Sequence, residues 1–387
     1  GASSSRKVRP VASHDPKKAK FEIVVGEPEY VGEAITGHYV YPIRVVNLQK
    51  DDLESEVHRR FSDIDSLHSQ LVAKFPGYII PPIPEKSTLS KLSPSVEFLR
   101  SRREGMQMFL MKIYTHPILG SCEEVEKFIT LPNSAYNAYK TDIESQKASG
   151  WMSYFSSVSK QVSNSLITAI SPNAAPRPKN DVDRVFDDYN DYFCHLDAQL
   201  QKLNTQSKVM LSRLEAENAA FMNMSILCHS LAKSEENEVE DCYNKGSKVF
   251  ETLAKNSLDQ MEKERDQFDI QIRDIINDVS AIREAVTRRC TTLRDLEMDE
   301  RDLTELRNQL AIRESSLTSS GLTLDEQEGR VLSSQKKLES MSRTIKEEIE
   351  NFQASKDARL SRLMGGYLAL QKSYAKEKYK ICESCRQ

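Results

Sequence analysis

From Asp181 to the end of the chain, hydrophobic residues recur at a spacing that predicts three long helices. Steps of three or four residues, or multiples of seven, keep the apolar positions on one side of a helix with about 3.6 residues per turn. The pattern breaks at residues 234–238 and 315–321, and each break is short enough to join antiparallel neighbours. The three stripes include Val185, Phe193, Leu200 and Leu214, then Phe268, Ile272, Val279 and Ile282, then Met341, Ile345, Ile349 and Leu363.

Helices of this length are not stable alone, because each apolar stripe must be covered. Three antiparallel helices could cover one another within a monomer. The stripes are broad, however, and they continue to the helix ends, which favours a dimer. We therefore expect residues 180–387 to form an elongated three-helix bundle that pairs with a second chain.

The N-terminal part has the pattern of a small α+β domain, which we expect over residues 20–140. Residues 21–25 and 39–48 are predicted to be strands of a small antiparallel sheet, and Pro42 predicts an edge or a bulge in the second strand. The elements expected after these are a strand through Val57, helices over 63–74, 95–114 and 123–129, and a polyproline II stretch at 81–84.

Two further segments flank this domain. Residues 1–19 are rich in Ser, Lys and Arg and predict a disordered basic tail. Residues 141–179 form a linker in which 150–170 predict an amphipathic helix with a Ser-rich polar face. Such a helix suits shallow insertion between lipid headgroups; the alternative is a helix that packs on the neighbouring domains, and we favour membrane contact. Its apolar positions are Trp151, Phe155, Val158, Val162, Leu166 and Ile170.

Composition and charge argue against several classes of function. The net charge is −4, so no global basic field favours nucleic acid. No apolar run approaches the roughly 20 residues that a membrane-spanning helix needs. No secretory signal pattern opens the chain, and Gly1 in place of Met indicates a processed or truncated start.

Enzymatic and metal-binding functions also lack their usual patterns. The seven cysteines are scattered, and the Cys382–Cys385 pair lacks a second pair or a histidine cluster, so we expect reduced cytosolic thiols. The sequence shows no phosphate-binding glycine loop, nucleophile elbow or metal-spaced histidine set. We therefore expect no enzyme, no catalytic residues, no metal and no cofactor.

Four residues of the N-terminal domain have the side chains that a phosphorylated sugar ring would need: Arg60, Phe61, Lys86 and Arg102. A guanidinium offers paired donors that match phosphate oxygens, and a lysine supplies a mobile point charge. An aromatic ring can cover the C–H face of an inositol. The four residues are expected on a strand end, after a proline stretch and on a helix, so sequence alone does not bring them together. Taken singly, each charged residue is more often a solvated surface group.

The combination of motifs resembles the PX domain of the sorting nexins over about residues 20–135. The resemblance rests on Arg-Arg-Phe-Ser-Asp at 59–63, Pro-Pro-Ile-Pro-Glu-Lys at 81–86, Glu-Phe-Leu at 97–99 with the arginine pair at 102–103, and His-Pro at 116–117. It implies a pocket for phosphatidylinositol 3-phosphate. In that pocket Arg60 would hold the 3-phosphate and Phe61 would stack on the inositol, where tyrosine is commoner. Lys86 would contact the 1-phosphate, and Arg102 the 4- and 5-hydroxyls.

The helical half is similar to the BAR domain of PX-BAR sorting nexins, a likeness carried by residues 341–352 and by the architecture. It implies a curved dimer whose concave face lies on membrane. A basic group near the far end of the second helix would then meet anionic lipid, although interleaved acids such as Asp295 and Glu297 favour an ordinary solvated face for any single residue. The basic group is Arg288, Arg289, Arg294, Arg301 and Arg307, with Lys336 and Lys337 in the return helix.

Taken together, the resemblance implies a non-enzymatic, cytoplasmic protein that is peripheral on the cytosolic face of endosomal membranes. It would sense or drive curvature and form tubules for cargo sorting and for retrograde or recycling transport. The implied partners are phosphatidylinositol 3-phosphate, anionic membrane, a second copy or a related sorting nexin, a retromer-like cargo complex and a higher-order coat. The alternative is a phosphoinositide-addressed coiled-coil scaffold that tethers protein partners without remodelling membrane.

Overall fold

A computed structural model of the chain separates it into two compact units. The first unit holds the N-terminal α+β domain, the first long helix up to residue 190, and residues 281–349. The second unit holds residues 191–280 and 350–387. The residues that the structure describes are 21–32, 37–47, 52–84, 94–147, 180–312 and 323–384.

The α+β domain is built on an antiparallel sheet whose central strand is β3. Strand β4 pairs with β3 over residues 40–47, so β1 and β2 follow one another along the other side of β3. Successive side chains of a strand point to opposite faces, and Tyr41, Ile43 and Val45 enter the core from β3. The strands are β1 (Phe21–Val25), β2 (Glu29–Val31), β3 (His38–Asn47) and β4 (Asp52–Arg60).

Pro42 lies in this central strand, whereas the sequence predicted an edge or a bulge at this position. It faces the interruption between β1 and β2, where its carbonyl accepts from the Gly26 N–H at 2.7 Å. The N–H that proline lacks would face Gly26 at the same interruption and not β4, so the ladder between β3 and β4 is unaffected. The bulge lies farther along β3, between Val45 and Val46.

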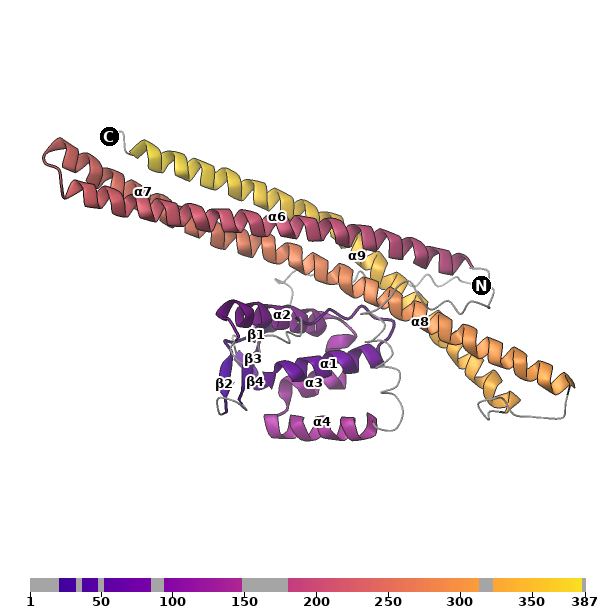
Figure 1. Cartoon of the computed structure of the whole chain (residues 1–387). Coiled ribbons are helices and arrows are strands. Elements are labelled where there is room, and N and C mark those ends of the chain that lie inside the picture. Colours follow the sequence, from indigo (N-terminus) through magenta and orange to yellow (C-terminus); the bar gives the residue numbers. More distant parts are fainter. Residues whose placement is uncertain are drawn as a thin grey trace, which may run out of the picture. The chain divides into compact units, whose positions relative to one another are not determined.

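Helices α1, α2 and α3 lie beside the sheet (Figure 1) and share one apolar core with it. Helix α2 begins after Ser95, whose Oγ accepts from the Phe98 N–H at 3.2 Å and caps the helix. The sequence did not predict β2 or α4, and α4 continues past residue 140, where the linker was expected to begin. The helical segments are α1 (Phe61–Lys74), α2 (Val96–Thr115), η2 (Leu119–Ser121), α3 (Glu123–Thr130) and α4 (Asn133–Lys147).

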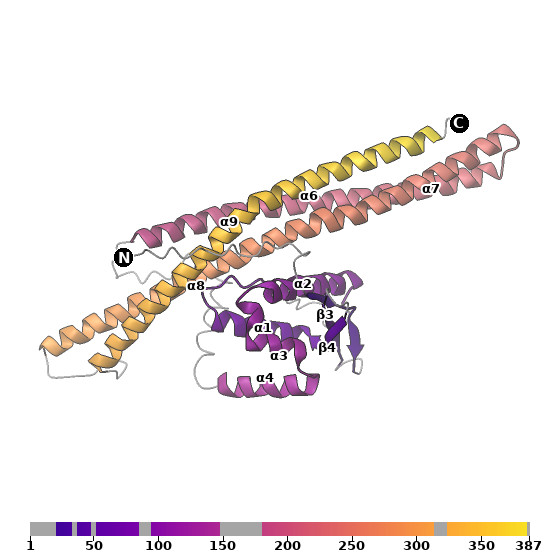
Figure 2. The same cartoon turned by 180° about the vertical axis from the view of Figure 1, so that it is seen from behind.

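The apolar stripes of the C-terminal region form long helices, as the sequence predicted. In the second unit α6 and α7 run antiparallel (Figure 2). Asn218 donates to the Ala254 carbonyl at 2.7 Å, and seven residues farther along α6 Ser225 meets the earlier residue Ser247 of α7 at 3.1 Å. In the first unit Leu296, Leu303, Val331 and Leu338 bury one another between α8 and α9. The helices are α6 (Asp181–Ala232), α7 (Glu238–Glu264), α8 (Ile270–Ile312) and α9 (Leu324–Glu383).

A π-helical turn, η3 (Arg265–Asp269), separates α7 from α8, where the sequence pattern predicted one continuous helix. A π turn inserts an extra residue and shifts the phase of the apolar stripe. Phe268 of this turn stacks on Tyr367 of α9, with ring centroids 4.2 Å apart. Beside it, Glu264 is buried and accepts from Gln260 at 2.7 Å and from Gln371. A polar layer therefore accompanies the change of phase.

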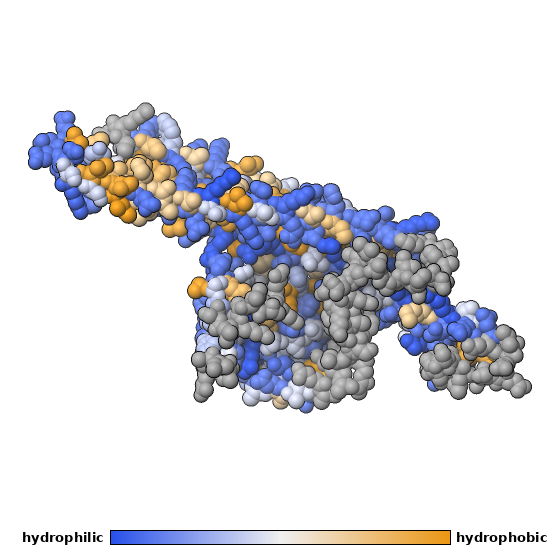
Figure 3. All heavy atoms as spheres, in the orientation of Figure 1, coloured by the Kyte–Doolittle hydropathy of each residue, from blue (hydrophilic) through white to orange (hydrophobic). Residues whose placement is uncertain are grey.

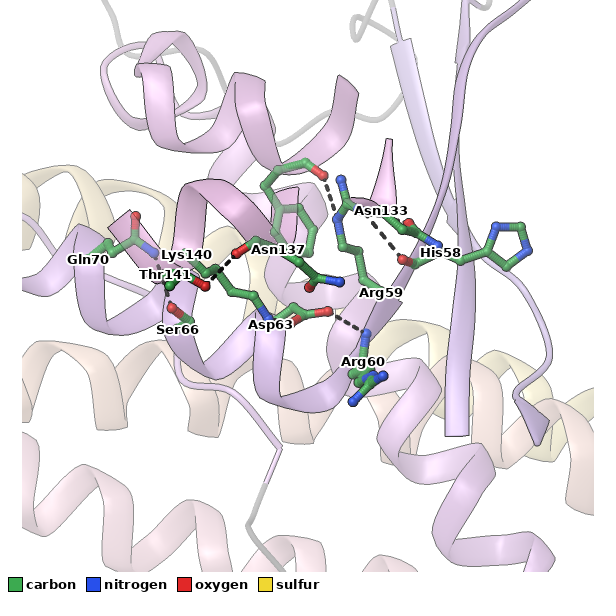
Figure 4. A network of polar contacts seen from close by, with 11 residues as sticks. His58, Arg59, Arg60, Asp63, Ser66, Gln70, Asn133, Asn137, Lys140 and Thr141 are labelled. Atoms are coloured by element: carbon green, nitrogen blue, oxygen red, sulfur yellow. Dashed lines mark hydrogen bonds and ion pairs between the residues drawn. The ribbon is translucent and has the colours of Figure 1, made fainter. Parts of the chain in front are cut away.

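Arg59 ties β4 to the region of α3 and α4. Its side chain is 1% exposed and donates to the carbonyl oxygens of Phe128 at 2.9 Å and Leu131 at 2.6 Å, and to Asn133 Oδ1 at 2.9 Å. The guanidinium also lies 4.3 Å from the ring centroid of Tyr136. Figure 4 shows the side chain pointing into this network. A guanidinium stays charged when buried, so it needs this set of acceptors.

Replacing Arg59 with Met should destabilise the α+β domain, because the acceptors around this buried guanidinium lose a charged donor. Hydrogen bonds to a charged group contribute about 1.5–3 kcal/mol each, so we expect the free energy of unfolding of this domain to fall by about 3 kcal/mol. Native-state hydrogen exchange of the β3 amides measures this change. The matched control is Arg44→Met, since Arg44 is an exposed residue of the same sheet that pairs with Glu56 at 3.2 Å. Equal, small effects of both substitutions would contradict the structural role of Arg59.

Candidate functional site

Arg60 ends β4 and, unlike Arg59, has an exposed side chain. Its backbone N–H donates to Asp63 Oδ2 at 2.8 Å, which fixes the turn from strand to helix. Asp63 also pairs with Lys140 of α4. In Figure 4 the Arg60 side chain points away from the Arg59 network. Within the described part of the chain its guanidinium has no ion-pair partner, so its charge can meet an anion.

His38 lies close to this charge. Val40 of β3 pairs with Arg60, and alternation along the strand puts His38, Val40 and Arg60 on one face of the sheet. Burial lowers the pKa of His38, and the positive charge of Arg60 lowers it further. The sequence analysis did not identify His38, because its proximity to Arg60 depends on the pairing of two strands.

Arg102 is held between two aromatic rings. Its guanidinium carbon lies 4.2 Å from the ring centroid of Phe61 and 4.3 Å from that of Phe98. Burial lowers the pKa of Arg102, while the nearby Tyr41 hydroxyl acts in the opposite direction. A guanidinium stacked in this way keeps its planar donors in one orientation before any ligand arrives.

The proline stretch reaches the same helix. A Cβ placed on Gly105 would lie 2.5 Å from Pro84 Cγ, so the two residues are in direct contact and only glycine fits there. Gly105 is three residues after Arg102 on α2, about one helical turn. The described end of the proline stretch therefore lies beside the stacked arginine.

The structure thus brings together three of the four residues proposed from the sequence. Phe61 follows Arg60 directly and touches Arg102. Lys86, the fourth, lies outside the described residues. The sequence analysis placed Phe98 in the motif but gave it no role at the site, although its position four residues before Arg102 on one helix face is a signal for that contact.

Arg103 has a different role from Arg102. It donates to the Val25 carbonyl at 3.4 Å and approaches Glu27 Oε1 at 3.5 Å. These contacts join α2 to the end of β1. The pair at 102–103 therefore divides into one residue at the candidate site and one that holds the helix on the sheet.

The basic group proposed on the second long helix is only partly at the surface. Arg288 is 3% exposed and Arg289 is 2% exposed, and both are bonded inside the first unit. The expectation that these two meet lipid is corrected, because neither guanidinium reaches the surface. Arg294, Arg301 and Arg307 are exposed, and their contact with lipid stays a prediction.

The amphipathic positions from Trp151 to Ile170 lie outside the described residues. Among the helices that the structure describes, none has a long enough apolar stretch to cross a bilayer. The described ranges also contain no group of three or more His, Cys, Asp or Glu side chains arranged to hold a metal ion.

Two family models match the chain. Residues 48–132 match the model of the PX domain, and residues 156–385, more than half of the chain, match the model described as Vps5 C terminal like. The first match covers β4, α1 and α2, which carry Arg60, Phe61 and Arg102, together with the proline stretch. The second covers the long helices.

Individual proteins give the same result. Sorting nexin-2 of Bos taurus is 25% identical over 362 residues, which cover 86% of this chain and 65% of that protein. Sorting nexin-2 of Homo sapiens is 34% identical over 120 residues, 28% of this chain and 23% of that protein. The chain thus spans less than two thirds of the length of these relatives.

One solved structure shares the fold over most of the chain. It is described as the cryo-EM structure of the SNX-BAR Mvp1 tetramer, and it has a TM-score of 0.57 at 18% sequence identity. The match covers 95% of this chain and 100% of that chain. At this identity the likeness concerns the fold alone.

The stacking of Phe98 on Arg102 should appear as a coupling energy. In a double-mutant cycle of Phe98→Leu and Arg102→Met, we expect about 1 kcal/mol of coupling, because a cation and a half-buried ring attract each other. Native-state hydrogen exchange of the α2 amides measures it. The control cycle pairs Phe98→Leu with Arg100→Met, since Arg100 is bound to Glu97; coupling there should be near zero. No coupling in the first cycle would contradict the stacked geometry.

Proposed function

The chain belongs to the PX-BAR sorting nexins, with a Vps5-like C-terminal region, and on that premise we propose that it is a peripheral protein of endosomal membranes. Its PX domain would bind phosphatidylinositol 3-phosphate, and its helical region would sense or drive membrane curvature for cargo sorting. The observation that carries the proposal is the separation of two neighbouring arginines. Arg59 is fully occupied inside the domain, while Arg60 is exposed beside Phe61 and the stacked Arg102.

Each described residue suits one part of the headgroup. Arg60 has an exposed guanidinium for the 3-phosphate, whose paired oxygens match its donors. Phe61 offers an apolar ring for the C–H face of the inositol. Arg102, half-buried and fixed by two rings, would donate to the 4- and 5-hydroxyls. Lys86 would add a charge for the 1-phosphate, two residues after Pro84 in the sequence.

Exposed apolar side chains in the second unit support self-association of the helical region. Figure 3 shows apolar side chains gathered over the α6–α7 hairpin. Contiguous exposed apolar surface of this kind usually marks a contact with another macromolecule. We propose that the partner is the helical region of a second copy of this chain. The exposed residues include Met222, Met224, Ile226, Leu227, Leu231 and Val239.

The lipid site and the self-association site would act together. A single headgroup pocket binds weakly, and two pockets on one dimer raise the time spent on a membrane through effective concentration. Recognition of the lipid would direct the protein to the membrane, and the paired helices would respond to membrane shape. Neither part requires catalysis.

Arg60→Ala should abolish flotation with liposomes that contain phosphatidylinositol 3-phosphate, because it removes the donor to the 3-phosphate. We expect at least a tenfold loss of bound protein, on the order of 1.4 kcal/mol or more. Arg44→Ala is the matched control, an exposed arginine of the same sheet, and should float like the unchanged protein. Retained flotation of Arg60→Ala would refute the assignment of the pocket. If the unchanged protein does not float either, the proposal that it binds phosphatidylinositol 3-phosphate is refuted.

Replacing both Ile226 and Leu227 with Asp should disrupt self-association, because these side chains are 59% and 57% exposed within the apolar surface. Light scattering should give twice the chain mass of 44.1 kDa for the unchanged protein and the single mass for the variant. Met298→Asp, at an exposed position of the first unit, should remain dimeric.

The same variants test membrane remodelling. Electron microscopy should show tubules when the dimer is mixed with liposomes and undeformed vesicles with the variant. If light scattering gives the single chain mass for the unchanged protein, the proposed dimer is contradicted. A dimer that leaves vesicles spherical would instead favour a tethering scaffold.

A further inference from the structure

We propose that Arg288, on helix α8, is a positioning residue for the headgroup pocket. It holds the segment that leads into the proline stretch, and so links lipid recognition to the helices. This proposal rests on the proposed binding of phosphatidylinositol 3-phosphate. It concerns contacts within the first compact unit only.

Arg288 is nearly inaccessible, and two of its three nitrogens donate to backbone of the α+β domain, while Nη1 lies 3.6 Å from Glu284 Oε1 on α8. It is 3% exposed; its Nη2 donates to the Tyr78 carbonyl at 2.9 Å and its Nε to the Pro76 carbonyl at 3.3 Å. Both acceptors lie in the turn after α1. A buried charge needs such partners, so removal of the guanidinium would leave two carbonyl groups without donors and release this turn.

Side-chain and backbone contacts from α9 surround the same turn. A Cβ on Gly77 would lie 3.2 Å from both Met341 Cα and Thr344 Cβ, which shows how closely the turn approaches the helix. The Tyr78 ring meets the His116 ring edge-on at 5.6 Å. The turn is therefore held between α8, α9 and the end of α2.

His116 adds a polar contact between the end of α2 and α9. Its Nδ1 accepts from the N–H groups of Ile118 and Leu119 at 3.2 and 3.1 Å. Nε2 is thus the nitrogen that faces Glu348 Oε1, at 3.5 Å. Because Nδ1 accepts two hydrogen bonds, the neutral ring carries its proton on Nε2 and can donate it toward Glu348.

Residues 80–84 connect this turn to the pocket and are held in place along their length. Ile80 is 1% exposed in the domain core, and Ile83 packs against that core. The prolines at 81, 82 and 84 restrict the backbone between these points. Pro84 then rests on Gly105, one turn from Arg102. The segment is fixed at Tyr78 by Arg288 and at Pro84 by α2, with little freedom between.

The consequence is a coupling between two functions. If the turn were released, only a fraction of molecules would hold the proline stretch in the conformation that completes the pocket, and the apparent affinity would fall by that fraction. Coupling of binding free energies is reciprocal. Binding of a headgroup should therefore strengthen the contact between the PX domain and the helices as well.

The test compares Arg288→Gln with Arg289→Gln in the full chain. Arg289 is an equally buried neighbour, but it bonds to Asp183 and Ser342 of the helices and not to the PX domain. Titration calorimetry with a soluble short-chain phosphatidylinositol 3-phosphate measures the affinity. We expect about a tenfold loss for Arg288→Gln and less than about a twofold change for Arg289→Gln. Arg288→Lys, which can reach one carbonyl, should restore part of the loss.

A second variant keeps the test decisive if Arg288→Gln does not fold. Gly77→Ala places a methyl group against α9 without touching the arginine, and should also weaken headgroup binding. Hydrogen exchange at residues 78–80 should rise in both variants.

The outcomes separate the two proposals. If the unchanged protein does not bind the lipid, the proposed function fails. If it binds and the variants at 288 and 77 bind equally well, or if Arg288→Gln and Arg289→Gln lose affinity equally, the positioning role fails while the lipid site stands.

Discussion

The N-terminal domain depends on one buried guanidinium, that of Arg59. Because this group cannot lose its charge, the interior must supply acceptors for it. Phe128, Leu131 and Asn133 supply them around the end of α3 and the start of α4. These bonds fix the two helices on β4. They also fix the direction of β4, and alternation along the strand then turns Arg60 to the opposite face.

Three pairs of adjacent arginines divide their roles by the geometry of the element that carries them. In a strand, neighbours point in opposite directions, which separates Arg59 from Arg60. In a helix, neighbours are about 100° apart, so Arg288 reaches the turn after α1 while Arg289 reaches Asp183 and Ser342. The pair at 102–103 divides in the same way, between aromatic rings and the end of β1. In each pair, at least one member makes structural contacts inside the first unit.

The sequence predicted the features that depend on local pattern. Period-two and period-3.6 spacing predicted β1, β3, α1, α2, α3 and the long helices, and the motif around Arg60 identified three residues that the structure brings together. Features set by contacts distant in sequence were missed or wrong. The burial of Arg288 depends on contact with a turn more than 200 residues earlier in the chain. Arginines interleaved with acids in the sequence predict a solvated surface instead. The π turn was missed because apolar residues on both sides of it keep helical spacing.

The position of Arg288 also bears on how weak contacts combine. Effective concentration between two linked sites is highest when the connection is short and stiff, and it falls as the tether lengthens or gains freedom. The chain connects the PX domain and the helices through the linker, but the bonds from Arg288 to Pro76 and Tyr78 make a second, direct connection. A buried, charge-assisted contact of this kind has little rotational freedom. The orientation of the α+β domain relative to α8 and α9 within this unit is therefore set by packing, so under the proposed function a membrane that binds the pocket would also act on the helices.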